Sequence, residues 1–396
     1  MSEERKMDAA NRRDFLMMAG AGAAVAMAGP SPALAQRPAA GRWRNAIIVN
    51  ALGGLSNPNV FSKGADSAIQ RGVRRRRTLD ARTLADAHAS GVTAVNCTLG
   101  YVAGEGDPFE VTISDIANYD QMIRAQSRDL VKILTAADIV QAKRDRRIGL
   151  IYGFQNAVMV GDDPTRIDMF ADLGVRIIQL TYNPANTIGD GSMAPQNRGL
   201  TPFGREVVER LNQNRIMVDL SHSGQRTCLE AARVSKQPIS INHTGCRAIT
   251  DLPRNKTDQE LRLVADRGGF VGIYFMPFLD LDGSAMAEDV VRHIEHAVKV
   301  CGEDHVGIGT DGPVTQIDDL ESYRERLAEE VAFRKRSGIG AAGEGPNTLP
   351  FVIDLRGPTQ FHRLAELLRA RGHSRLQIEK ILGGNFLRHA RTVWGG

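Results

Sequence analysis

Two histidines and an aspartate are the residues of this chain whose types and positions most suggest catalysis. His222 follows the run IMVDLS, His243 follows PISIN, and Asp311 follows HVGIGT. Neutral imidazoles together with a carboxylate are a ligand set that zinc favours. A single histidine at the end of an apolar run more often caps a buried strand. Three such groups at matching positions after separate runs favour a functional site.

Eight short apolar or β-branched runs, bounded by Gly, Asn and Asp, must position these side chains. They are Asn45–Asn50, Val92–Leu99, Ile148–Phe154, Val175–Thr181, Ile216–Leu220, Pro238–Asn242, Phe270–Phe275 and His305–Gly309. The runs lack the polar alternation of a half-exposed strand, which is typical of parallel strands that are covered on both faces.

Helical patterns separate the runs and follow the last of them. They are Leu79–Ala89, Ser114–Arg146, a helix opened by Thr201-Pro202, one opened by the capping box Thr257–Glu260, Ala287–Cys301, Leu320–Arg336, Thr359–Arg371 and Leu376–His389. Strands alternating with helices, without a linker, predict an α/β protein with a single (β/α)8 TIM barrel and extra C-terminal helices.

Barrel active sites lie at the C-terminal ends of the strands, so the residue that ends each run is a candidate for the site. In order these are Asn50 with Leu52 and Gly54, Asn96, Gln155, Tyr182, His222, His243, Tyr274 and Asp311. His222, His243 and Asp311 are therefore expected to converge on one mouth of the barrel.

The first 35 residues form a pattern of their own. An arginine pair, Arg12-Arg13, precedes the small-residue apolar stretch Phe15–Ala28, and Ala33-Leu34-Ala35 follows. This arrangement resembles a twin-arginine signal peptide, cleaved after Ala35, and implies export through the twin-arginine machinery to the periplasm. An apolar stretch this short does not suit a membrane span. We therefore expect residues 36–396 to form the mature domain.

Charge and cysteine content narrow the class of partner. The chain has 50 basic and 46 acidic residues among 396, a balance too even to indicate a nucleic-acid surface. Its four cysteines include no C-x-x-C pair, so neither a thiolate zinc site nor a redox motif is predicted. A small-molecule substrate is the expected partner.

Five motifs give the stretch from about Val175 to the C-terminus a family resemblance. They are GLTPFGREVV at Gly199–Val208, MVDLSH at Met217–His222, NHTGCRAITDLPRN at Asn242–Asn255, HVGIGTDG at His305–Gly312 and ILGGNFLR at Ile381–Arg388. The stretch resembles the membrane (renal) dipeptidase family of the amidohydrolase superfamily. The resemblance implies a barrel that holds two zinc ions and hydrolyses dipeptides.

The resemblance also implies roles for four residues in the second half of the chain. His222 and His243 correspond to ligands of the second zinc, Arg254 to the arginine that binds the substrate carboxylate, and Asp311 to the active-site aspartate. The bidentate guanidinium explains why arginine suits this position better than lysine. Members of this family are often dimers, so a homodimer is an option by analogy.

The first half departs from the family at four positions. Leu52 and Gly54 replace the His-x-Asp pair that binds the first zinc, Gln155 replaces the bridging glutamate, and Tyr182 replaces a histidine that contacts the reacting carbonyl. Leucine and glycine side chains cannot bind a metal, and a neutral amide supplies no charge to bridge two dications. The sequence therefore predicts one zinc at most, and none as the alternative.

One ion on His222 and His243 would take Asp311 or Gln155 as a third ligand and leave a position for water. Asp311 is alternatively the general base. We expect Tyr182 to donate a hydrogen bond to a developing oxyanion, and Gln155 and Asn156 to orient an amide or an amino acid. Tyr274, at the end of its strand, is a further candidate for substrate binding.

The predicted function is that of a periplasmic, dipeptidase-like amidohydrolase acting on a small peptide or amide with a free carboxylate. Two alternatives stay open on the sequence. One is a metal-free isomerase, lyase or tailoring enzyme that acts on an exported peptide metabolite. The other is a binding homologue without catalysis. Metal content separates them, because the alternatives need no zinc.

Overall fold

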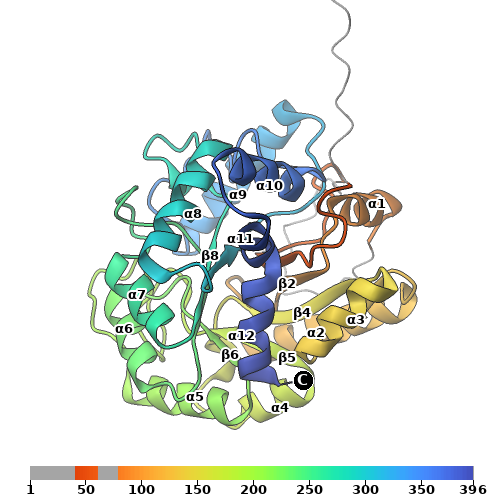
Figure 1. Ribbon diagram of the computed structural model, residues 1–396. Coiled ribbons are helices and arrows are strands. Elements are labelled where there is room, and N and C mark those ends of the chain that lie inside the picture. Colours follow the sequence, from red (N-terminus) through yellow and green to blue (C-terminus); the bar gives the residue numbers. More distant parts are fainter. Residues whose placement is uncertain (1–40, 61–78, 396) are drawn as a thin grey trace, which may run out of the picture. The chain divides into compact units, whose positions relative to one another are not determined.

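Eight parallel strands form the centre of the protein, and helices surround them (Figure 1). The computed structural model describes residues 41–60 and 79–395. The strand order is β1-β2-β4-β5-β6-β7-β8-β9, and every neighbouring pair is parallel. The ends of the sheet meet where the Asp311 amide donates to the Leu52 carbonyl at 2.9 Å. The predicted (β/α)8 barrel is confirmed.

The strands and helices have the following bounds. The strands are β1 Val49–Gly53, β2 Ala94–Leu99, β3 Leu130–Lys132, β4 Ile148–Phe154, β5 Val175–Gln179, β6 Met217–Asp219, β7 Ser240–Thr244, β8 Phe270–Ile273 and β9 Val306–Ile308. The helices are α1 Ala81–Ser90, α2 Pro108–Ala125, α3 Ala136–Asp145, α4 Arg166–Asp172, α5 Pro202–Gln213, α6 Gln225–Val234, α7 Asp258–Asp266, α8 Ala287–Cys301, α9 Leu320–Arg336, α10 Gln360–Ala370, α11 Arg375–Glu379 and α12 Asn385–Trp394.

Two predicted helical segments are interrupted. The segment Ser114–Arg146 contains β3, which pairs with the first residues of β4 and separates α2 from α3. The segment Leu376–His389 contains a π-helical turn, Lys380–Gly384, between α11 and α12. A Cβ at Gly383 would lie 2.4 Å from the Ile47 carbonyl oxygen, so only glycine allows this turn to approach the start of β1.

Local capping signals predicted two helix starts correctly. The Thr201 hydroxyl accepts from the Gly204 amide at 2.9 Å, and Pro202 occupies the first turn of α5. Thr257 and Glu260 form the reciprocal capping box of α7. These helices follow β5 and β7, so their starts fix the direction of the chain as it leaves the mouth of the barrel.

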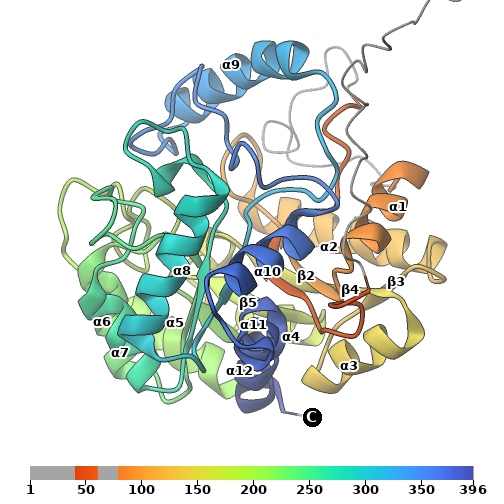
Figure 2. The same cartoon turned by 45° about the horizontal axis from the view of Figure 1, so that its top comes forward.

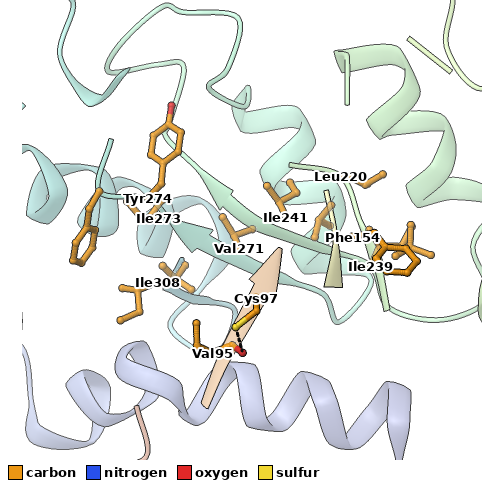
Figure 3. Close-up of a cluster of buried hydrophobic side chains, with 14 of the residues drawn as sticks. Val95, Cys97, Phe154, Leu220, Ile239, Ile241, Val271, Ile273, Tyr274 and Ile308 are labelled. Atoms are coloured by element: carbon orange, nitrogen blue, oxygen red, sulfur yellow. Dashed lines mark hydrogen bonds between the residues drawn. The ribbon is translucent and has the colours of Figure 1, made fainter. Parts of the chain in front are cut away.

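Apolar side chains from several strands belong to a large buried core (Figure 3). Val95 and Cys97 of β2 lie in one cluster with Ile241 of β7, Val271 of β8 and Ile308 of β9, and each is at most 2% exposed. Full burial of an aliphatic side chain contributes about 1.5–3 kcal/mol. This core makes the strand ends a rigid support for polar side chains.

Helix α9 differs from the helices that cover the strands. It lies at the rim of the barrel with the loop that follows it (Figure 2), and Leu327 is its one buried residue. The helix ends its mainly polar sequence with Arg334, Lys335 and Arg336. Side chains of α9 form part of the wall of the cavity described below.

The predicted signal peptide, residues 1–35, lies outside the described residues. Within the described ranges, no helix combines the length and apolar character needed to cross a bilayer. All four cysteines lie within the described residues, and each is buried.

Candidate active site

One cavity of about 330 Å³ brings together five of the predicted site residues. Gln155, Tyr182, His222, Arg254 and Asp311 all line it. They follow strands β4, β5, β6, β7 and β9, so the cavity lies at the C-terminal ends of the strands, where barrel chemistry is expected. His243, at 0% exposure, lies directly behind His222.

The two predicted metal-binding histidines face each other. Nε2 of His243 lies 2.9 Å from Nε2 of His222, and the ring centroids are 4.9 Å apart. The histidines come from different strand ends, which the Asp219 carboxylate at the end of β6 holds together. Its Oδ1 accepts from the Ser221 amide and the Asn242 amide, both at 3.0 Å.

Hydrogen bonds fix the tautomer of His222. Nδ2 of Asn183 donates to the Ile339 carbonyl at 2.8 Å, so Oδ1 of Asn183 is the acceptor for Nδ1 of His222 at 2.7 Å. Nδ1 therefore carries the hydrogen and Nε2 presents a lone pair. Burial, followed by the charge of Arg254, holds the pKa of both His222 and His243 well below the usual value, so both imidazoles are neutral at pH 7.

Arg254 is a buried cation beside this pair, with 2% exposure. Its Nη1 donates to the Ser221 carbonyl at 2.6 Å and its Nη2 to Nε2 of His222 at 3.1 Å. Both acceptors are neutral, and within the described residues no carboxylate forms an ion pair with this guanidinium. A buried charge without a direct ion pair is unfavourable, so the site is suited to an anionic ligand that contacts the guanidinium.

Asp311 adds an unusual carboxyl group to the cavity. Its backbone has φ of +57°, a left-handed conformation that aspartate tolerates better than most residues. Burial raises the pKa of Asp311 to about 6, although the Arg254 and Arg334 charges act against this rise. At pH 7 the group is mainly ionised and still basic enough to accept a proton.

Tyr182 stacks on His222 with ring centroids 4.1 Å apart and an interplanar angle of 21°. Its hydroxyl oxygen accepts from Nη1 of Arg334 at 3.2 Å, which leaves the tyrosine O–H free to donate. The Glu344 carboxylate in turn holds Arg334 at 2.6 Å. Tyr182 is thus oriented from both sides.

The four departures from the family motif lie mainly on the other side of the mouth. Leu52 is buried, and Gly54 donates its amide to the Gly312 carbonyl at 3.2 Å. Nε2 of Gln155 donates to the Thr98 hydroxyl at 2.6 Å. This side therefore holds its structure through backbone and amide hydrogen bonds, without a charged ligand.

Two predicted substrate-binding residues do not line this cavity. Asn156 lies in a neighbouring pocket, and its Oδ1 accepts from Nδ2 of Asn186 at 3.0 Å. Tyr274 is fully buried, and its hydroxyl donates to Oδ1 of Asn255. The guanidinium carbon of Arg254 lies 5.9 Å from the Tyr274 ring centroid, so Tyr274 supports Arg254 from below the cavity wall.

Sequence reasoning missed Asn183 and Arg334. Asn183 follows Tyr182 directly, and a strand-end asparagine next to a candidate residue is a usable signal. Arg334 gave no such signal, because it stands in the charged run FRKR of α9 and resembles a solvated face. Its low exposure of 15% follows from the packing of α9 over the mouth.

The residues around the mouth differ in the donors they offer to a metal ion. Leu52, Gly54 and Gln155 supply no charged donor for a first zinc. The two Nε2 atoms would need to separate from 2.9 Å to about 3.3 Å to share a tetrahedral ion at ordinary Zn–N distances of about 2.05 Å. No group of three His, Cys, Asp or Glu side chains in the described chain is arranged to hold an ion. An ion on the imidazole pair would take its other ligands from water or substrate.

The sequence matches the family described as membrane dipeptidase (Peptidase family M19) over residues 74–337. This chain belongs to the membrane dipeptidase family. A protein in the pqqA 5′ region of Klebsiella pneumoniae is 29% identical over 301 residues, which cover 73% of this chain and 98% of that one. The dipeptidase verJ of Clonostachys rogersoniana is 28% identical over 235 residues, covering 58% and 61% of the two chains.

Solved structures of the family share the fold. An amidohydrolase from Pseudomonas aeruginosa superposes with a TM-score of 0.73 at 30% identity, covering 89% of this chain and 98% of that one. A metallopeptidase from Rhodobacter sphaeroides, bound to a phosphinate mimic of L-Ala-D-Ala, superposes with a TM-score of 0.66 at 21% identity, covering 88% and 100%. The chain is thus a dipeptidase-like metallohydrolase by family.

Proposed function

We propose that this protein hydrolyses a small peptide or amide that carries a free carboxylate. The observation that carries the proposal is the buried Arg254 guanidinium, which opens into the cavity without a carboxylate partner among the described residues. A substrate carboxylate would supply the missing counter-charge. Drawing Nη2 toward this carboxylate would also remove one of the two contacts on Nε2 of His222, the other being Nε2 of His243.

Three side chains then supply the chemistry around the scissile amide. Asp311, with a pKa of about 6, accepts a proton from water and passes it to the leaving amine. The O–H of Tyr182, left free by the bond from Arg334, donates to the oxygen on which negative charge develops. Arg254 holds the carboxylate end so that the amide faces these two groups.

His222 and His243 are the residues that would hold a single zinc ion in this account. When bound, such an ion supplies Lewis acidity and lowers the pKa of water. The support is the tautomer of His222, because its Nδ1–H bond to Asn183 is the arrangement that commonly orients metal-binding histidines. Because the alternative functions need no metal, the zinc content of the protein has to be measured.

Export to the periplasm by the twin-arginine route is part of the proposal and rests on the sequence of residues 1–35. Replacing Arg12-Arg13 with a lysine pair is expected to leave the precursor in the cytoplasm of a bacterial host. Fractionation followed by immunoblotting measures this. Periplasmic recovery of the double variant equal to that of the native sequence would contradict the assignment.

The direct test of the proposed function is hydrolysis of a dipeptide panel by the zinc-loaded protein. Each dipeptide is compared with its C-terminal amide, which lacks the carboxylate. We expect cleavage of free dipeptides and a loss of about tenfold or more in kcat/KM for the capped forms, as for a lost charge-assisted hydrogen bond. Equal rates for both forms would contradict the role of Arg254, and absence of all hydrolysis would favour the alternatives.

A further inference from the structure

Three side chains in another part of the cavity wall have buried polar atoms without a hydrogen-bond partner among the described residues. They are the Thr315 hydroxyl, Nη1 of Arg356 and Nε2 of Gln360. Thr315 is 2% exposed and Gln360 is 3% exposed. Buried polar groups in folded proteins are nearly always paired, so three such groups on residues that line one cavity favour a polar ligand there.

These groups lie in one neighbourhood of the chain. Arg356 and Gln360 flank Gly357, where a Cβ would lie 3.0 Å from Oε1 of Gln316. Gln316 is the neighbour of Thr315, so the segment after β9 packs against the segment that leads into α10. Both segments are distinct from the β6 and β7 ends that carry the histidine pair and the loop that carries Arg254.

The chemistry of the three groups selects an anion. Arg356 is a cation whose guanidinium carbon lies 5.0 Å from the Phe351 ring centroid, and Nε donates to the Ile353 carbonyl at 3.2 Å. No carboxylate of the described residues forms an ion pair with it. The Gln360 amide nitrogen and the Thr315 hydroxyl both donate. A guanidinium, an amide N–H and a hydroxyl together match the acceptor oxygens of a carboxylate.

The wall also has an apolar part. The cavity that contains Arg254 and Arg356 is also lined by Phe275, Phe278, Tyr323, Leu327, Phe351 and Leu355. A ligand that contacts both Arg254 and Arg356 would pass these side chains. A ligand with methylene groups between two carboxylates would match both the apolar side chains and the two arginines that it contacts.

We propose that Thr315, Arg356 and Gln360 form a second carboxylate subsite, which selects substrates that carry an acidic group in addition to the carboxylate bound by Arg254. The substrate class is then a dipeptide or small amide with two carboxylates. This inference rests on the proposed function for the placement of the first carboxylate. The preference for a second acid is independent of whether hydrolysis occurs.

Matched ligands that cannot be hydrolysed test the subsite. The probes are phosphinate mimics of Ala-Glu and Ala-Gln, and of Glu-Ala and Gln-Ala, titrated by calorimetry into the zinc-loaded protein. Within each pair only one carboxylate is exchanged for an amide. We expect the acidic member of at least one pair to bind about ten- to hundredfold more tightly, as for a hydrogen-bonded charge pair.

Variants assign this preference to the cluster. Arg356→Met keeps the length of the side chain and is expected to remove the acid preference while leaving the affinity for the amide member within about twofold. Thr315→Val, a near-isosteric change, is expected to reduce the preference and provides a second test if Arg356→Met does not fold. Arg369→Met is the control, because Arg369 is exposed on α10 and pairs with Glu366.

The outcomes separate the two proposals. Equal affinities within both pairs, or an acid preference that survives both Arg356→Met and Thr315→Val, overturn the subsite. Absence of hydrolysis with the acid preference intact counts against the proposed function alone. Arg254→Lys should weaken both members of a pair equally, because it acts on the carboxylate that they share.

Discussion

The two sides of the barrel mouth carry different kinds of side chain at their strand ends. After β6, β7 and β9 stand His222, His243, Arg254 and Asp311, which are buried or half-buried groups that can bind a ligand or carry a proton. After β1 and β4 stand Leu52, Gly54 and Gln155, which form backbone and amide hydrogen bonds or pack in the core.

This difference shows that the strand ends after β1 and β9 are joined without metal-binding side chains at positions 52 and 54. Leu52 still accepts from the Asp311 amide, and the Gly54 amide still bonds the Gly312 carbonyl, so the two sides remain joined. The fold is carried by the backbone and the apolar core, while the chemistry depends on a few side chains. In the proposed function, the side after β6, β7 and β9 binds the substrate, and the side after β1 and β4 offers no charged metal ligand.

The largest effect is expected for Asp311→Asn. Loss of the general base should lower kcat/KM by about 10²–10⁴-fold. In the native protein, kcat/KM should rise as pH passes through about 6, because Asp311 must be ionised to accept a proton. A pH profile of a cleaved dipeptide measures this. An acidic limb that persists unchanged in the variant would assign the titration to another group.

Arg254→Lys should have the next largest effect. Lysine keeps the charge and loses the planar fork that binds a carboxylate, so KM for free dipeptides should rise about ten- to hundredfold. Arg205→Lys is the matched control, since Arg205 is 49% exposed on α5. Circular dichroism verifies folding. A KM within twofold of the native value would remove Arg254 from the substrate site.

Much of this arrangement follows from sequence patterns, and the rest has physical reasons for being hidden. Continuous apolar runs predict the eight barrel strands, and the run IGLIYGF, Ile148–Phe154, gives β4 with the right bounds. β3 was missed because three residues between two helices carry no period. The start of α2 at Pro108 was missed as well, although Asp107 caps it.

The site residues also divide into those that the sequence predicts and those that it does not. Residues at strand ends are found from the sequence because the strand fixes their position. Asn156 and Tyr274 are expected to bind substrate. Asn156 follows Gln155 directly and lines the neighbouring pocket, and Tyr274 precedes Phe275 directly and is buried in the core. Arg334 and Arg356 come from elements after the barrel, whose packing no local pattern describes.

A smaller effect is expected on stability. Asp311 has a pKa of about 6 in the folded protein against 3.8 ordinarily, so the folded state binds this proton more tightly. The contribution of Asp311 to stability therefore falls as pH rises from about 4 to 6, and the ionised form is unfavourable at pH 7. Asp311→Asn should raise the free energy of unfolding at pH 7 by about 1–3 kcal/mol.

Urea denaturation of the native protein and the Asp311→Asn variant at pH 4 and pH 7 measures this effect. The difference between them should be larger at pH 7 than at pH 4. A difference independent of pH would mean that burial does not disfavour the ionised carboxylate.

The last prediction concerns zinc binding after metal-binding donors are placed on the strand ends that follow β1 and β4. Gly54→Asp has space, because a Cβ there meets no atom within 4 Å. Combined with Leu52→His and Gln155→Glu, it should raise the zinc content by up to one ion per chain. Elemental analysis measures the change. An unchanged zinc content in a folded triple variant would show that side chains alone do not explain the difference between the two sides.

Zinc content of the native protein is the most direct test of the central claim, that one side of the mouth retains a ligand pair and the other has none. The protein is purified without chelator, dialysed against excess zinc, desalted and analysed by mass spectrometry of the metal. We expect no more than one zinc ion per chain, reduced to background in both His222→Ala and His243→Ala. Two ions per chain, or one ion that both variants retain, would contradict this claim.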